Sequence, residues 1–392
     1  MKRLKWLIYL LSFFMTINFT TPVFASFCQL NHGLNSAQIT SLFAVYSLSV
    51  FVLEIPTGVL SDKVGENKSL IIGAAFTAFA MFLFIEGTTV LLYVGEFVLG
   101  LGSTFFSGPF DSIIYKYCKD SRNNLDFDDI VSKSYSLQWI ALCFSFFGCF
   151  AIMKKGELVH VFWITFVSNI ILLIIACLLP RINYDVKNNA NDIVKKYFWE
   201  IVSNRKLLII CMLNVCFSLI LVTGYQILQT YLLGSSVSNT YNGLLYFIAA
   251  VFASSGAYFY KKLKSIFKSE KILINLCLAL LALCMLGLGL TPVMIFIFVF
   301  VCIYRLVWGI TSPMFSSMVN QSIEDDSFRN TAFSIISLGC NLGSSALLFI
   351  FSAINMCAEL EYIILGMLCI VLLVGCIIFE QIYKKHNCEK IE

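Results

Sequence analysis

Charged side chains are scarce in this chain. Of its 392 residues only 13% are Asp, Glu, Lys or Arg, whereas 59% are hydrophobic, and the mean hydropathy is +0.85. About a quarter of the residues of a soluble domain are charged, so this composition excludes an ordinary soluble protein. The net charge of +4 is therefore no sign of nucleic-acid binding, and the positions of the basic residues are more informative than their sum.

Residues that hold metals or cofactors are also few or scattered. There are three His, and the fifteen Cys form no Cys-x-x-Cys pair. No phosphate-binding Gly-x-x-x-x-Gly-Lys-[Ser/Thr] pattern occurs, so we expect no direct use of ATP. We expect no metal and no cofactor, with the Cys acting as small apolar side chains. A membrane-embedded enzyme would need a cluster of His, Cys or carboxylates, and none is visible.

Long apolar runs fill most of the sequence. Each is close to the roughly 20 residues that a helix needs to span a bilayer, so they predict an all-α membrane protein with twelve transmembrane helices. The end of the first run resembles a signal-peptide cleavage region, but the run is longer than the usual apolar core of about 7–15 residues, so we expect it to be retained. The runs lie near 5–28, 41–61, 69–87, 89–115, 132–153, 158–180, 207–229, 240–259, 271–289, 292–319, 331–355 and 361–380.

The distribution of Lys and Arg predicts the orientation. With the N-terminus in the cytoplasm, 24 of the 27 basic residues fall in inner segments, two in outer loops, and one, Arg305, within a run. Such a bias is typical of cytoplasmic loops. We therefore expect a multi-pass protein of the cytoplasmic membrane, the inner membrane of a cell that has two, with both termini in the cytoplasm.

A central loop divides the runs into two sets of six. Residues 181–206 carry six basic residues and apolar residues at helical spacing, which predicts an amphipathic helix at the membrane surface. We expect an N-terminal six-helix half over 1–180, this linker over 181–206, and a C-terminal six-helix half over 207–392.

The stretch Glu-Ile-Pro-Thr-Gly-Val-Leu-Ser-Asp-Lys-Val-Gly-Glu-Asn-Lys over 54–68 carries the most recognisable pattern. It places charged residues in a short turn between two apolar runs. Its spacing resembles the loop between helices 2 and 3 of major facilitator superfamily transporters, and 54–58 resembles a bacterial, drug-efflux-like branch. The residues that carry this gating motif are Gly58, Asp62, Lys63, Gly65 and Lys68.

The resemblance extends over most of the chain and implies a fold and a function. Residues 95–115, 225–234 and 328–343 resemble helices four, seven and eleven of the same branch. The implied fold is two pseudo-symmetric halves around a midplane site. The implied function is secondary active transport of a small molecule by alternating access, as proton-coupled efflux by a monomer in the bilayer, without nucleic acid. Within the same resemblance, Asp111 joins Asp62, Lys63 and Lys68 in a cytoplasmic latch between the halves.

Two alternatives stay open. The Gly-Pro-rich signature of many drug–proton antiporters has no counterpart in 132–153, so an importer of a small metabolite remains a candidate. A non-transporting membrane sensor is the candidate from another class, although no apolar-poor stretch is long enough for an appended soluble domain.

Ionisable residues within apolar runs are candidates for function because charges are costly at membrane depth. Arg305 lies near the middle of its run and needs a cavity or an acid partner. Glu96 is the first candidate for that partner and for the proton carrier, and Glu54 is the second. A structural ion pair without a transport role is the competing interpretation.

Amide and aromatic residues at comparable depth suggest a substrate pocket, since a few polar groups among aromatic rings suit amphipathic organic ligands. The same residue types also serve as packing or interface anchors. The candidates are Gln138, Trp139, Tyr225, Gln226, Gln229 and Trp308.

The orientation is testable by cysteine labelling. In a background without reactive native Cys, we expect Asn35→Cys to react with an impermeant thiol reagent from outside intact cells, and Asn189→Cys to react only after permeabilisation. Labelling of position 189 from outside would contradict the twelve-span topology.

Overall fold

The computed structural model describes residues 2–107, 109–110, 113–114, 127–155, 158–180, 203–235, 237–267, 269–322 and 329–388. Within these ranges the chain forms helices and no strands. Most of the predicted linker, 181–202, lies outside the described residues. The basic end of that linker is not separate from the bundle, because Arg205 and Lys206 open the first helix of the C-terminal half.

We call residues 2–180 the N half and residues 203–388 the C half. The helices of the N half are α1 Lys2–Thr16, α2 Phe24–His32, α3 Ser36–Val64, α4 Glu66–Glu86, α5 Thr89–Ser107, α7 Phe127–Met153 and α8 Leu158–Leu178. Those of the C half are α10 Arg205–Gly234, α11 Asn239–Phe267, α12 Glu270–Leu290, α13 Met294–Ser322, α14 Arg329–Ala353 and α15 Ala358–Cys388.

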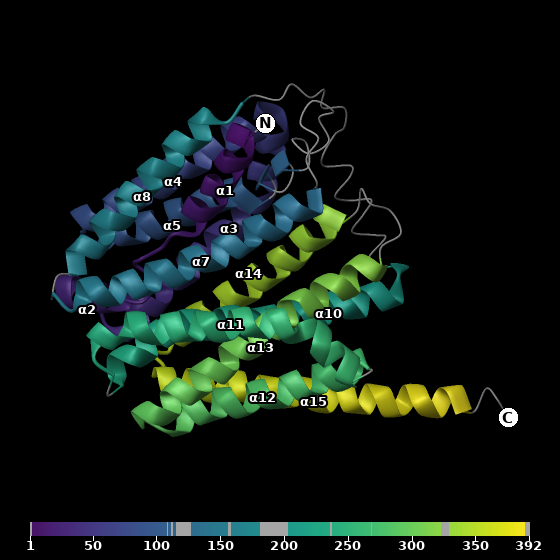
Figure 1. Ribbon diagram of the computed structural model, residues 1–392. Helices are drawn as coiled ribbons and strands as arrows, with labels where there is room; N and C mark the ends of the chain where they lie inside the picture. The colour runs from purple at the N-terminus through teal and green to yellow at the C-terminus, as the bar shows by residue number, and fades with distance from the viewer. Residues whose placement is uncertain are drawn as a thin grey trace.

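The two halves form two packed groups of helices, with the N half above and the C half below in Figure 1. The groups meet along two seams. At one seam α3 packs against α14, and at the other α7 packs against α11. We call the end of the bundle that carries the turn over 62–68 the turn side, and the opposite end, where α2 lies, the far side.

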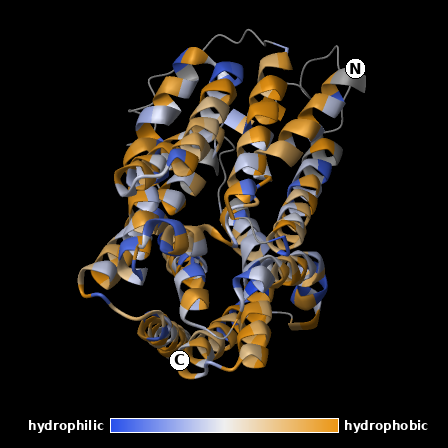
Figure 2. Ribbon diagram, turned by 90° about the vertical axis from the view of Figure 1, so that its left-hand side faces the viewer, coloured by the Kyte–Doolittle hydropathy of each residue, from blue (hydrophilic) through white to orange (hydrophobic). Residues whose placement is uncertain are grey.

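Eleven helices of the described chain are long and apolar enough to cross a membrane, and α1 contributes a shorter apolar helix, Leu4–Thr16. Hydrophobic residues occur along all the helices, as the hydropathy colours of the ribbon show (Figure 2). A helix in hydrocarbon satisfies its own backbone groups, which is why this composition folds as a helical bundle. The prediction of an all-α membrane protein is confirmed.

The first predicted span is wrong as a continuous helix. The run over 5–28 breaks after Thr16, and helix resumes at Phe24. The Asn18 side chain causes the break, because its Oδ1 accepts hydrogen bonds from the backbone N–H groups of Thr20 and Thr21, at 3.0 and 3.1 Å. Pro22 adds to the effect, since the residue before a proline is disfavoured in helical conformation.

The corner between α3 and α4 is built by the motif that the sequence singles out. Gly65 has a φ angle of +87°, a backbone conformation that residues other than glycine rarely adopt. Its N–H donates to the carbonyl of Ser61 at 2.8 Å and ends α3. Behind the corner the hydroxyls of Ser61 and Ser69 lie 2.6 Å apart, and Ser69 donates to the carbonyl of Phe105 at 3.1 Å, which holds the turn against α5.

Contacts between the halves gather toward the far side. A single buried apolar cluster runs from α2 and α3 of the N half into α10 to α15 of the C half. Gly243 lets α11 approach α7 so closely that a Cβ there would lie 2.6 Å from the backbone nitrogen of Phe150. In the described chain, four hydrogen bonds join the halves: Ala25 N to Gln229 Oε1, Ser26 Oγ to Asn239 Oδ1, Gln226 Nε2 to Ser47 Oγ, and Ser345 Oγ to the carbonyl of Ala44.

Candidate functional site

A cavity of about 450 Å³ lies between the two halves. Both halves contribute to it, and it reaches from the middle of the bundle toward the turn side, because it includes Phe106 near the end of α5 and Ser312 in the second half of α13. Its lining is Met15, Thr16, Ile17, Asn18, Thr21, Thr77, Met81, Leu99, Ser103, Phe106, Trp139, Leu142, Phe146, Thr165, Asn169, Tyr225, Arg305, Trp308 and Ser312.

Arg305 is the one charged residue among the described residues that line this cavity. It is 6% exposed, and its guanidinium carbon lies 4.7 Å from the ring centroids of both Tyr225 and Trp308. The two rings stand nearly perpendicular, at 89° and 5.7 Å between centroids. Cation–π contacts of this kind attract a guanidinium without neutralising its charge.

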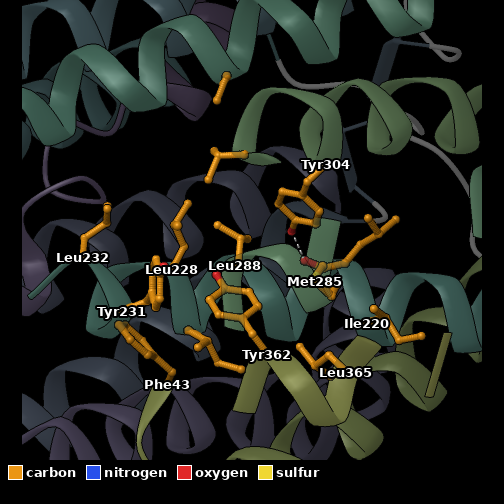
Figure 3. Close-up of a cluster of buried hydrophobic side chains, with 14 of the residues drawn as sticks. Phe43, Ile220, Leu228, Tyr231, Leu232, Met285, Leu288, Tyr304, Tyr362 and Leu365 are labelled. Atoms are coloured by element: carbon orange, nitrogen blue, oxygen red, sulfur yellow. Dashed lines mark hydrogen bonds between the residues drawn. The ribbon is translucent and has the colours of Figure 1, made fainter. Parts of the chain in front are cut away.

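The packing of the C half fixes this arrangement. Tyr304, next to Arg305 on α13, donates its hydroxyl to the carbonyl of Leu221 on α10. Tyr362 of α15 donates to the carbonyl of Gly224 at 2.8 Å. Figure 3 shows both tyrosines among the buried leucines of α10, α12 and α15. Since α10 is anchored at Leu221 and at Gly224, in the turn directly before position 225, its Tyr225 is held over Arg305.

The break between α1 and α2 forms one wall of the cavity. Ile17, Asn18 and Thr21 line it from the non-helical segment, and the backbone N–H of Asn18 donates to Ser145 Oγ of α7 at 3.1 Å. Non-helical backbone at membrane depth occurs where it lines a cavity or is buried in protein. The sequence analysis missed this wall. Its signal was the polar sequence Asn-Phe-Thr-Thr-Pro over 18–22 inside an apolar run.

Other polar side chains of the lining also escaped the sequence analysis. Four of them lie on three helices: Thr77 on α4, Ser103 on α5, and Thr165 and Asn169 on α8. Their hydroxyl or amide groups bond to carbonyls one turn away in the same helix; Asn169 Nδ2, for example, donates to Thr165 O at 3.0 Å. Because such hydroxyls can donate to a carbonyl of their own helix, the sequence alone gives no reason to assign them to a site.

The structure places the predicted pocket residues in three different surroundings. Trp139, Tyr225 and Trp308 line the cavity with Arg305. The two other glutamines serve the seam between the halves: Gln226 joins Ser47 of α3 to Ser344 of α14, and Gln229 accepts from the N–H of Ala25. Gln138 lies outside the described lining, and its backbone carbonyl accepts from Thr16 Oγ1 at 3.4 Å.

The two candidate acids lie on the α3–α5 seam rather than in the cavity lining. Glu96 of α5 is 4% exposed, and the Tyr46 side chain lies within electrostatic range of both Glu96 and Glu54. Glu54 of α3 accepts from Ser107 Oγ at 3.0 Å near the turn side. No ion pair joins Glu96 to Arg305 in the described part of the chain.

The predicted latch falls largely outside what the structure describes. Asp111 is not among the described residues, and for Asp62 only the helical backbone is described. Lys63 and Lys68 are exposed at the corner that Gly65 forms, and open space surrounds Gly58. The latch therefore stays a prediction.

A second hollow of about 660 Å³ lies wholly within the C half, between α10, α12, α13 and α15. Its lining is mostly apolar, with Lys206, Glu270 and Lys271 among it. Because one half alone forms it, a movement between the halves does not open it alternately to the two sides.

The cavity between two helical halves agrees with the outcome of the sequence comparison. A model of the Major Facilitator Superfamily matches residues 6–348. The chain belongs to the major facilitator superfamily. It is thus a membrane transporter by family, and no comparison places it in the drug-efflux branch.

Individual relatives are distant. The uncharacterized transporter BU466 of Buchnera aphidicola subsp. Acyrthosiphon pisum (strain APS) is 24% identical over 178 residues, which cover 44% of this chain and 42% of that protein. The match therefore spans less than half of that relative's length.

Solved structures share the fold over nearly the whole chain. The nucleoside transporter NupG has a TM-score of 0.74 at 12% identity, over 95% of this chain and 97% of that one. A POT family transporter in complex with 5-aminolevulinic acid has 0.73 at 13%, over 96% and 95%. A D-xylose–proton symporter has 0.72 at 12%, over 95% and 96%. At these identities the likeness concerns the fold, and it confirms the predicted major facilitator fold.

The Asn18 turn gives a stability prediction. Asn18→Ala removes an acceptor for two backbone N–H groups and for Thr20 Oγ1 at 2.8 Å. We expect a loss of about 2 kcal/mol, because buried donors lose their partner. Thermal unfolding of the purified protein in detergent measures it. Asn18→Asp keeps the acceptor and should lie much closer to wild type; an equal loss in both variants would contradict this role for Oδ1.

Proposed function

We propose that this protein is a secondary active transporter that moves a small organic solute through the cavity between its halves. The observation that carries the proposal is a polar-and-aromatic cavity formed jointly by both halves, with Arg305 in its lining. Two halves that rock around a shared midplane site expose it to one side and then the other. A volume of about 450 Å³ lies within the range of small-molecule sites, roughly 300–1,000 Å³.

The conformation supports alternating access. The hydrogen bonds between the described residues of the two halves close the far side, while the cavity extends toward the turn side. The positive-inside bias of the sequence puts the turn side in the cytoplasm. We therefore assign this structure to an inward-facing state, in which the seams α3–α14 and α7–α11 are the gate that opens outward.

Proton coupling is the second part of the proposal. Glu96 and Glu54 flank the half-buried Tyr46 on the α3–α5 seam, and Tyr46 bonds to Ser103, which lines the cavity. An acid inside the membrane that can be protonated is a common element of proton relays. We assign the coupling proton to Glu96, with Glu54 as the next candidate.

The direction we propose is efflux, which rests on the resemblance of residues 54–68 to the drug-efflux-like branch. The alternative is import of a small metabolite. It is favoured by α7, where Gly148 is the only glycine and no proline occurs between Phe127 and Met153.

The alternating movement is testable through Gly243. Gly243→Ala places a methyl group against the backbone of α7 at the seam between the halves, so we expect it to favour the state in which α7 and α11 separate. Spin labels on Asn35→Cys and the native Cys357, one exposed residue of each half on the far side, should show a longer distance in this variant by pulsed electron resonance.

Two variants serve as controls for that experiment. Gly309→Ala meets the carbonyl of Ala253 within the C half, so it should lower stability by about 1–3 kcal/mol without lengthening the distance. Gly375→Ala meets nothing within 4 Å and should change neither. An unchanged distance in Gly243→Ala would remove the support for a gate at this seam.

The coupling assignment predicts that Glu96→Gln separates exchange from accumulation. In proteoliposomes that carry a pH gradient, wild type should accumulate a transported solute, whereas Glu96→Gln should only exchange it, because exchange needs no net proton movement. Glu361→Gln is the matched control, since Glu361 is 2% exposed in α15 and lies outside the described cavity lining. Gradient-driven accumulation by Glu96→Gln would transfer the assignment to Glu54.

A further inference from the structure

The cavity has an unbalanced charge. Arg305 brings one positive charge, and no Asp or Glu occurs among the described residues that line it. The carboxyls of Glu96 and Glu54 do not reach the guanidinium, for which the described chain provides neither a hydrogen bond nor an ion pair. A buried cation without a partner is costly at the centre of a bilayer.

The guanidinium is also held in a defined position. Tyr225 and Trp308 contact it through the faces of their rings, and a ring face offers no oxygen or nitrogen acceptor to the N–H groups. The Nε atom is buried and has no hydrogen-bond partner. The N–H groups of the guanidinium can therefore donate hydrogen bonds to a molecule that enters the cavity. Planar carboxylates match such a fork through two parallel hydrogen bonds.

We propose that the transported solute is a small organic monocarboxylate whose carboxylate binds Arg305. This inference rests on the proposed transport function and adds its substrate class. One guanidinium balances one negative charge. A phosphate monoester carries a charge of about −1.5 to −2 at neutral pH, so part of its negative charge would remain unbalanced in the cavity. The solute also has an apolar or aromatic body, because Phe106, Trp139 and Phe146 line the same cavity.

The polar wall opposite the arginine suits the remainder of such a molecule. Asn18 uses its Oδ1 for the turn that follows α1, which leaves its amide N–H groups as donors at the cavity wall. The hydroxyls of Ser103 and Thr165 donate to carbonyls of their own helices, so they offer acceptor oxygens. A hydroxyl or amide substituent on the carboxylate's body would find partners there.

The test is binding by matched pairs of compounds to the purified, full-length protein in detergent. The pairs are phenylacetate with phenylacetamide, indole-3-acetate with indole-3-acetamide, and hexanoate with hexanamide, with phenyl phosphate as the phosphate arm. Binding is measured as thermal stabilisation. We expect at least one carboxylate to bind and its amide to bind at least about 10-fold more weakly, since charge-assisted hydrogen bonds are about twice as strong as neutral ones.

Variants of Arg305 connect the binding to this side chain. Arg305→Gln should weaken the carboxylate by about 10- to 100-fold, and Arg305→Lys should restore part of it, because it keeps the charge without the planar fork. Arg205→Gln, at an exposed position, is the control and should bind like wild type. Without ligand, Arg305→Gln should be at least as stable as wild type, since it removes an unpaired buried charge; a loss of folded protein would indicate a structural ion pair and overturn the proposal.

The remaining outcomes separate the substrate class from the transport function. Equal binding of acid and amide, a preference for phenyl phosphate, binding that survives Arg305→Gln, or no binding of any carboxylate would each overturn the monocarboxylate. Counterflow of the bound carboxylate in proteoliposomes tests transport independently. Arg305-dependent binding without counterflow would support the carboxylate site and reject the proposed transport function. Counterflow of neutral solutes alone would support transport and reject the monocarboxylate.

Discussion

Every polar group that this chain places in the hydrocarbon region needs a partner within the protein, and that constraint explains the plan of the bundle. Ordinary helices meet it by themselves. The break after Thr16 meets it through Asn18, whose Oδ1 takes the N–H groups of Thr20 and Thr21. The hydroxyls of Tyr304 and Tyr362 meet it by bonding to carbonyls of α10. Arg305 is an exception at the cavity, because its guanidinium has aromatic contacts but no acceptor in the described chain.

The exception lies where the two halves share a space. The hydrogen bonds of Gln226 and Gln229 and the close approach at Gly243 hold the halves together toward the far side. The cavity is left between that seam and the turn side. The hydrogen bonds of this seam can be exchanged for water when the halves separate. The apolar cluster that runs between the halves at the same end would have to expose part of its surface.

Sequence analysis predicted the parts of this arrangement that depend on composition. Apolar runs gave the spans, and the depth of Arg305 within its run placed it at the site with Tyr225 and Trp308. It did not give the break in the first run, since a single Asn side chain decides it. It also could not distinguish glutamines of the seam from glutamines of a pocket. Gln226 and Gln138 look alike in sequence, and their roles depend on contacts with residues more than a hundred positions away along the chain.

The separation of the acids from the arginine bears on the proposed coupling of protons to substrate. Glu96 lies in the α3–α5 seam, where Gly100 brings α5 against Ser49 and the backbone of Tyr46. Tyr46 in turn contacts Ser103 on the cavity wall. In the proposed coupling, a change of charge at Glu96 therefore acts on the cavity through the packing of two helices of one half, and not through a shared ion pair. In the proposed mechanism the C half balances the charge of the substrate and the N half carries the proton, so coupling between them passes through the movement of the halves.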